Sequence, residues 1–217
     1  METVNELKRA HSVGEQIANT VSHGIAMLAA AAAAPILIYA AAQQGSVWSI
    51  VGASIFAATM LLLYVTSTIY HVLPSCRAKE IFKILDHGAI FLLIAGTYTP
   101  FTLGVLRGTW GWILFGLVWS LALIGIVLKV RSKAKDSRTS TILYLVMGWL
   151  VVIAIEPLLL HMSSWGLFWL FAGGIAYTVG VIFFVLDHRV KYAHFIWHLF
   201  VIAGTSCHFF AVLFHSY

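Results

Sequence analysis

Seven long apolar stretches dominate this sequence and constrain its fold more than any other feature. A helix needs about 20 predominantly apolar residues to cross the hydrocarbon core of a bilayer. Stretches of this kind run over residues 18–42, 47–73, 83–105, 109–130, 140–161, 165–186 and 193–214. Only 10% of the residues are charged, against about a quarter in a soluble domain. The sequence therefore predicts an all-α membrane protein, a bundle of seven transmembrane helices.

The connections between these stretches are too short to hold a second domain. Residues 43–46 join the first two stretches, and residues 161–164 join the fifth and sixth. We therefore expect a polar N-terminal segment, residues 1–16, followed by one seven-helix domain, residues 17–217. The first apolar stretch continues well past its alanine run, so we interpret it as an uncleaved helix rather than a signal peptide.

Lysine and arginine fall almost entirely on one side of the predicted bundle. Twelve of the thirteen lie in alternate loops, and Arg107 alone lies on the other side. The twelve are Lys8, Arg9, Arg77, Lys79, Lys83, Lys129, Arg131, Lys133, Lys135, Arg138, Arg189 and Lys191. The positive-inside rule places this side in the cytoplasm, with the C-terminus outside. A rhodopsin-type receptor would have the opposite orientation. The basic residues form no aromatic-interleaved patch, so nucleic acid is not expected as a partner.

Polar side chains gather near the predicted cytoplasmic ends of four helices. They are Glu15, Asn19 and His23 in the first stretch, Ser67 and His71 in the second, Asp86 at the start of the third, and His194 and His198 in the last. Residues four apart on a helix share one face. Polar groups inside a membrane are costly and usually functional. The pattern therefore predicts that these side chains meet in one layer.

Histidines in this layer predict a metal site. His194 and His198, four residues apart, can ligate one ion, and His71 can complete a three-histidine site with an open fourth position. Asp86 and Ser67 are suited to hold a water molecule or orient the histidines. The pair of histidines alone would favour a structural interpretation slightly, so the prediction depends on the whole set. One zinc ion is the default, with iron or copper left open.

Other polar residues have more ordinary interpretations. We expect Glu15, Asn19 and His23 to cap the first helix and brace the site. Isolated interfacial histidines such as His11 are expected to be simple hydrogen-bonded residues. His208 lies about 15 Å from His198 along the same helix, too far to share its metal. Pro157 should kink its helix. The adjacent Glu156 is either a protonated, hydrogen-bonded group or part of an outer vestibule.

An ordered set of short blocks resembles a known family. The blocks are Glu15-x3-Asn19-x3-His23, Ser67-x3-His71, Leu85-Asp86, Gly96-Thr97-Tyr98-Thr99-Pro100 and His194-x3-His198. In this order and spacing they are similar to the signature blocks of the hemolysin III proteins. These proteins form the bacterial branch of the progestin and adipoQ receptor family, which includes the adiponectin receptors. The resemblance covers the chain from Glu15 nearly to its end.

The resemblance implies a seven-helix bundle in the bacterial inner membrane, with its N-terminus inside. It also implies one zinc ion near the cytoplasmic face, held by histidines that match His71, His194 and His198. The family's acidic residue matches Asp86, and its serine matches Ser67. The bacterial branch is associated with membrane lipid homeostasis. The wider superfamily includes alkaline ceramidases, so the analogy suggests membrane lipids as substrates. No ligand-binding extracellular domain is predicted, and no soluble hormone is expected.

Three functions remain open at this point. The first is a zinc-dependent hydrolase of lipid amides, in which Asp86 accepts a proton from water and Ser67 orients that water. The second is a non-catalytic sensor of membrane state, in which zinc clamps two helices together. An open fourth coordination position favours the hydrolase, and a fourth protein ligand favours the clamp. The third is a pore, for which the outer half of the sequence offers few polar residues.

The predicted orientation can be tested with reporter fusions. A reporter that is active only in the periplasm should be active when fused after Tyr217 and silent when inserted between Lys129 and Arg138. The physical reason is that basic loops are retained in the cytoplasm. The reverse pattern of activity would show that the orientation is wrong.

Overall fold

The computed structural model describes residues 11–133 and 138–216, and in these residues helices alternate with short loops, without a strand. Seven of its helices are long and apolar enough to cross a membrane, so the predicted all-α bundle is confirmed. They are α1 (Val13–Gln43), α2 (Val47–Val72), α3 (Arg77–Leu103), α4 (Thr109–Arg131), a broken helix over Arg138–His161, α7 (Ser164–Leu186) and α8 (Ala193–His215). Lys8, Arg9, Lys135 and Tyr217, with residues 1–10 of the predicted N-terminal segment, lie outside the described residues. The orientation stays a prediction.

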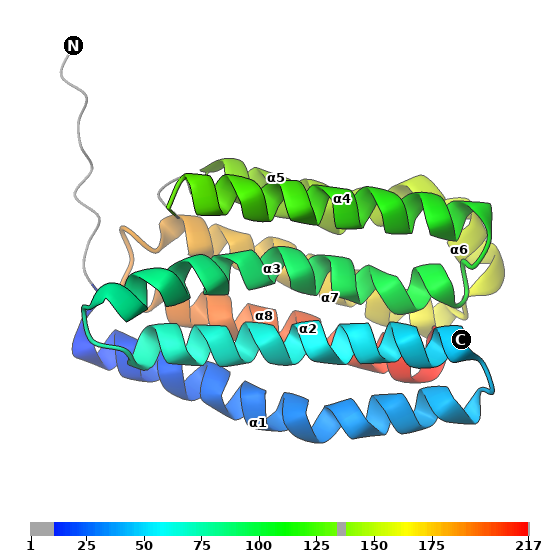
Figure 1. Cartoon of the computed structure of the whole chain (residues 1–217), viewed down its shortest axis with the longest axis horizontal. Coiled ribbons are helices and arrows are strands. Elements are labelled where there is room, and N and C mark those ends of the chain that lie inside the picture. Colours follow the sequence, from blue (N-terminus) through cyan, green and yellow to red (C-terminus); the bar gives the residue numbers. More distant parts are fainter. Residues whose placement is uncertain (1–10, 134–137, 217) are drawn as a thin grey trace, which may run out of the picture.

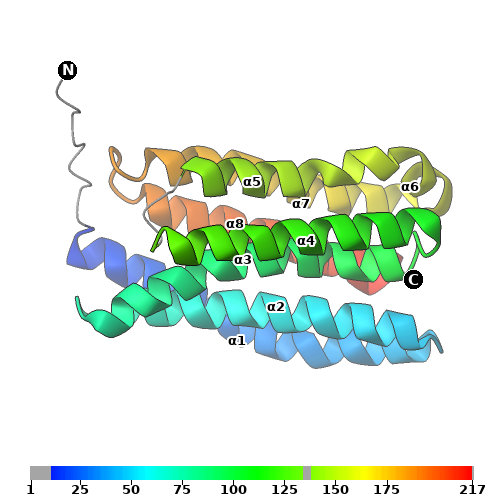
Figure 2. The same cartoon turned by 45° about the horizontal axis from the view of Figure 1, so that its top comes forward.

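The helices form a closed ring of antiparallel neighbours (Figures 1 and 2). Each helix contacts the next one along the chain, and α8 closes the ring by contacting α1 as well as α7. The beginnings of α1, α3 and α8 and the end of α2 therefore lie at the same end of the bundle (Figure 1). This arrangement brings the four polar helix ends together.

Two helices extend beyond the apolar stretches that predicted them. Helix α1 begins at Val13 rather than near residue 18, and α3 begins at Arg77 rather than at residue 83. Hydropathy marks only the part of a helix that suits hydrocarbon, whereas backbone hydrogen bonding continues into the polar turns beyond it. The polar residues at the starts of α1 and α3 are therefore helical, although they lie outside the apolar stretches.

Helix α1 has its polar face inside the bundle and its apolar face outside. Ile17, Val21 and Ile25, spaced at intervals of four, are more than half exposed, as expected for a face in contact with lipid. Asn19 and His23, on the opposite side of the same turns, are buried. This sidedness is the reverse of that in a water-soluble helix, because lipid rather than water surrounds the bundle.

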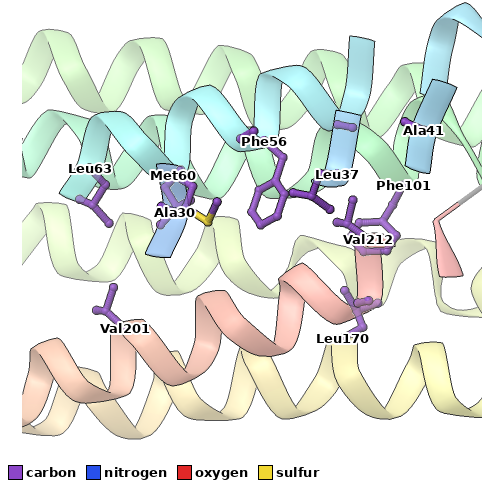
Figure 3. Close-up of a cluster of buried hydrophobic side chains, with 14 of the residues drawn as sticks. Ala30, Leu37, Ala41, Phe56, Met60, Leu63, Phe101, Leu170, Val201 and Val212 are labelled. Carbon is purple, nitrogen blue, oxygen red and sulfur yellow. The ribbon is translucent and has the colours of Figure 1, made fainter. Parts of the chain in front are cut away.

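The apolar core follows the axis of the bundle between α2 and α8 (Figure 3). Phe56 and Met60 of α2 lie on one side of it, and Val201 and Val212 of α8 on the other. Small residues allow the helices to approach closely elsewhere, as is common in membrane bundles. A Cβ on Gly52 of α2, for example, would lie 2.7 Å from the backbone of Pro100 in α3.

The fifth spanning segment is broken, as Pro157 predicted. It consists of α5 (Arg138–Trp149), a 3₁₀ helix η1 (Leu150–Ala154) and a short helix α6 (Ile155–His161). Proline has no N–H to donate four residues back, so the regular helix is interrupted before it. The Tyr98 hydroxyl of α3 replaces two of the backbone hydrogen bonds that are lost at the break. It donates to the Gly148 carbonyl at 2.9 Å and accepts from the Val151 N–H at 2.8 Å.

The contact between α2 and α3 should not tolerate a methyl group at Gly52. We expect Gly52→Ala to destabilise the bundle by about 1–3 kcal/mol, the usual cost of overpacking, and to lower the midpoint of thermal unfolding in detergent. The matched control is Gly116→Ala in α4, where a Cβ meets nothing within 4 Å. Equal melting temperatures for the two variants would contradict the close contact.

Candidate metal centre

Three histidines meet at the end of the bundle where α2 ends and α8 begins. His71, His194 and His198 each offer a ring nitrogen, and these three atoms lie within 4.8 Å of one another. The ring centroids are 4.8 to 5.1 Å apart. All three side chains are buried. The structure thus brings together the three residues that the sequence singled out as metal ligands.

Hydrogen bonds to Nδ1 select one tautomer for two of these rings, His71 and His198. Nδ1 of His71 donates to Oε1 of Gln16 at 3.0 Å. Nδ1 of His198 lies 3.2 Å from Oγ of Ser22, whose own hydrogen is directed to the Asn19 carbonyl, so the serine oxygen must accept. Each Nδ1 therefore carries the proton, and each Nε2 keeps a lone pair.

His194 follows the same pattern through a carboxylate. Its Nδ1 lies 3.4 Å from Oδ2 of Asp187, at the C-terminal end of α7. At this distance the carboxylate attracts the ring without making a well-aligned hydrogen bond. Nδ1 has no hydrogen-bond partner among the described residues, and a carboxylate can only accept, so its charge favours a proton on Nδ1 and a lone pair on Nε2. Metal-bound histidines commonly have such a partner on the other nitrogen.

The three lone pairs fit a divalent metal ion. Nε2 of His71 is buried without a hydrogen-bond partner in the described part of the chain, which is costly for a polar atom unless something binds it. Three neutral imidazoles with paired Nδ1 atoms are a common ligand set for zinc and related ions. The group can therefore hold a metal ion.

Asp86, Ser67 and His23 form a second row beside the three histidines. The His23 ring stacks on His198, with centroids 3.5 Å apart and planes inclined by 7°. Nδ1 of His23 lies 2.8 Å from Oγ of Ser67, and Ser67 and Asp86 both line the same interior cavity. Nε2 of His23 is buried without a partner among the described residues. The row therefore places a carboxylate, a hydroxyl and a second bare imidazole nitrogen next to the metal ligands.

Glu15 ties the start of α1 to the start of α8. Its carboxylate accepts from the Ser12 backbone N–H in a capping box that begins α1. It also accepts from the Tyr192 N–H at 2.9 Å. Tyr192 has a left-handed backbone, with φ 60°, and immediately precedes α8. Glu15 thus holds the turn that carries His194, and its side chain lies outside the group of metal ligands.

Asp187 has a second histidine partner. Nε2 of His11 lies 2.9 Å from its Oδ1, and the two residues are joined across nearly the whole length of the chain. Partial burial raises the pKa of the Asp187 carboxyl, but His11 and His194 outweigh this effect and hold the pKa below its ordinary value. His11 is therefore hydrogen-bonded, as the sequence predicted, and its partner Asp187 also lies beside His194.

Sequence reasoning missed Gln16 and Ser22, although a signal for both exists. They extend the polar face of the first helix that Glu15, Asn19 and His23 already marked. Asp187 gave no such signal, because its partners come from helices distant in sequence. Asn19 is fully buried, and its side-chain amide has no hydrogen-bond partner among the described residues.

A cavity leads away from the site along the interior of the bundle. At one end it is lined by Asp86, His194 and His198, and toward the other end by Leu158 and His208. The centre of a water-sized sphere can occupy about 120 Å³ within it. Its walls are contributed mainly by α3, α5, α7 and α8 and are predominantly apolar. Glu156 lies outside this lining and is exposed on α6.

A family model and individual relatives, compared with this chain, agree with one another. The family model described as "Haemolysin-III related" matches residues 11–209. The chain is 48% identical to the "Hemolysin-3 homolog" of Bacillus subtilis, over 94% of this chain and 95% of that one. It is 43% identical to "Hemolysin-3" of Bacillus cereus, over 94% and 92%. The human "Monocyte to macrophage differentiation factor" is 27% identical over 76% and 70%. No solved structure matches the chain.

The tautomer of His71 should depend on Gln16. Gln16→Leu keeps the size of the side chain but removes the acceptor for Nδ1, so we expect zinc affinity, measured by chelator competition, to fall about 10–100-fold. The matched control is Gln43→Leu, an exposed position at the other end of α1. His194→Ala removes a ligand and should abolish stoichiometric zinc binding.

Two results would contradict this description of the site. Equal zinc affinities for Gln16→Leu and Gln43→Leu would show that Gln16 does not orient His71. Normal zinc content in His194→Ala would remove His194 from the ligand set.

Proposed function

This chain belongs to the haemolysin III-related family of multi-pass membrane proteins, and we propose that it is a zinc-dependent hydrolase of membrane lipid amides. The site would work at the cytoplasmic side of the bacterial inner membrane. The observation that carries this proposal is the position of the three-histidine group at the end of an apolar cavity that also contains a carboxylate. An acyl chain suits the cavity, and a polar amide suits its histidine-lined end.

The lining of the cavity supports access from the membrane. Trp149 of α5 and Thr178 of α7 both line it and are partly exposed on the outside of the bundle. Their side chains are joined by a hydrogen bond of 3.1 Å. The cavity thus extends to the lipid-facing surface between these helices. A lipid could enter there without leaving the bilayer, and its acyl chain would remain in an apolar environment.

The chemistry follows from the residues beside the histidines. When bound, zinc would polarise the amide carbonyl and lower the pKa of a water molecule to about 7. Asp86 would accept the proton from the attacking water and later deliver it to the leaving amine nitrogen. Ser67, which lines the same cavity as Asp86 and lies next to His23, would orient the water. The products are a fatty acid and an amine.

A non-catalytic sensor is the second candidate, and one observation favours it. Nε2 of His23 is buried without a partner among the described residues, in a ring stacked on His198. A fourth imidazole would close the site, as in structural zinc centres. X-ray absorption of the zinc-loaded protein separates the candidates. Three nitrogen ligands and an oxygen support the hydrolase, whereas four nitrogens support a clamp.

Substitution of Asp86 distinguishes a catalytic zinc site from a structural one. Asp86→Asn keeps the shape and one acceptor oxygen but removes the base. We expect zinc to stay bound, because its three imidazoles are unchanged, and lipid amide cleavage to fall by roughly 10²–10⁴. Zinc affinity and cleavage should be measured on the same purified protein. Glu156→Gln, the same change at an exposed position outside the cavity lining, is the matched control.

Other outcomes would count against the hydrolase. A loss of zinc affinity of about 10–100-fold in Asp86→Asn would indicate that Asp86 only orients the metal ligands. A wild-type protein that holds zinc but cleaves no amide or ester lipid, across a panel that includes long-chain ceramides, would leave the sensor as the better account.

A further inference from the structure

A second polar cluster lies in the cavity, away from the metal ligands. His208 and Tyr177 both line the cavity, and Thr205 lies beside them on α8. His208 and Thr205 are buried. The His208 ring packs on Gly173 of α7, where a Cβ would lie 2.5 Å from its Nε2. The proposed hydrolysis uses none of these residues.

The hydrogens of this cluster are all directed to other protein atoms. Nε2 of His208 lies 3.1 Å from the Leu170 carbonyl, which can only accept, so Nε2 carries the proton. Thr205 donates to the Val201 carbonyl at 2.7 Å. Its oxygen must therefore accept from the Tyr177 hydroxyl, 2.8 Å away.

The cluster consequently holds lone pairs and no free donor beside the cavity. In the neutral ring, Nδ1 of His208 is an acceptor, and it is buried without a partner among the described residues. An unsatisfied buried acceptor destabilises the folded protein unless a donor binds it. The Tyr177 oxygen, whose hydrogen goes to Thr205, adds a second acceptor. A group that donates a hydrogen bond would satisfy them, whereas a carbonyl or a purely hydrocarbon chain would not.

We propose that His208 and Tyr177 form a subsite for a hydroxyl group on the chain of a bound lipid. The inference builds on the proposed function, because it assumes that the cavity takes an acyl chain. It narrows the ligand class from lipids in general to lipids with a mid-chain hydroxyl. The hydroxyl donates to Nδ1 of His208, while the rest of the chain contacts the apolar walls.

The spacing along α8 sets the position of that hydroxyl. His198 and His208 are ten residues apart, or about 15 Å along the helix. An extended chain advances about 1.2 Å per bond, as the three-bond repeat of an extended polypeptide does. The hydroxyl should therefore lie roughly 12 bonds from the group held at the histidine end. 12-Hydroxystearate has this spacing, and 2-hydroxystearate has the same hydroxyl in the wrong place.

Equilibrium binding to the full-length protein in lipid nanodiscs tests the subsite. Stearate, 12-hydroxystearate and 2-hydroxystearate are the probes. We expect wild type to bind 12-hydroxystearate about 3–10-fold more tightly than the other two, the worth of one net hydrogen bond. His208→Phe should remove this preference and retain stearate binding. Tyr177→Phe, which keeps the ring, should reduce the preference, and His161→Phe, at an exposed histidine, should leave it unchanged.

The outcomes separate this inference from the proposed function. Equal affinities of wild type for stearate and 12-hydroxystearate would overturn the subsite and leave the proposed hydrolase intact. Water would then be the partner of Nδ1 of His208. A preference that survives in both His208→Phe and Tyr177→Phe would also overturn it. If neither fatty acid binds, the subsite and the proposed function both fall. A preference that depends on His208, together with normal cleavage by Asp86→Asn, would support the subsite and remove the proposed mechanism.

Discussion

The contact between α1 and α8 is the interaction on which the rest of the structure depends. It closes the ring of helices, and it is made largely by polar groups. Ser22 accepts from His198, His23 stacks on the same ring, and Glu15 holds the turn before α8. Each hydrogen bond inside a membrane contributes only about 0.6 kcal/mol on average. Their joint effect is geometric, because they fix two histidines of α8 relative to a third on α2.

Each of the three proposed ligand histidines is oriented by a polar partner beside its Nδ1 atom. Nδ1 of every proposed ligand faces a different partner, namely an amide, a hydroxyl and a carboxylate. These partners come from α1 and from the end of α7. Helices α2 and α8 alone would bring the three histidines together. The partners from α1 and α7 orient the three rings, which is the requirement for binding a metal.

The break in the fifth span connects the fold to the cavity. Pro157 interrupts the helix, and Tyr98 of α3 satisfies the backbone groups that the break leaves. The broken segment packs less extensively than its neighbours and lines the cavity with Trp149, Val151 and Leu158. The kink in this segment leaves space between α3, α7 and α8. The same cavity then links two buried polar clusters, one at His198 and one at His208.

The sequence by itself determined the seven spans, the kink at Pro157 and the shared depth of the polar residues. Length, hydropathy and intervals of four residues are local properties, and a membrane leaves few alternatives to a helix for such segments. The roles of Asp187 and His11 were decided only by the tertiary structure, because they meet across nearly the whole chain. So were the choice of tautomer at each histidine and the lone pairs left at His208. These depend on which atoms face one another, and sequence spacing defines the face of a helix but not its neighbour.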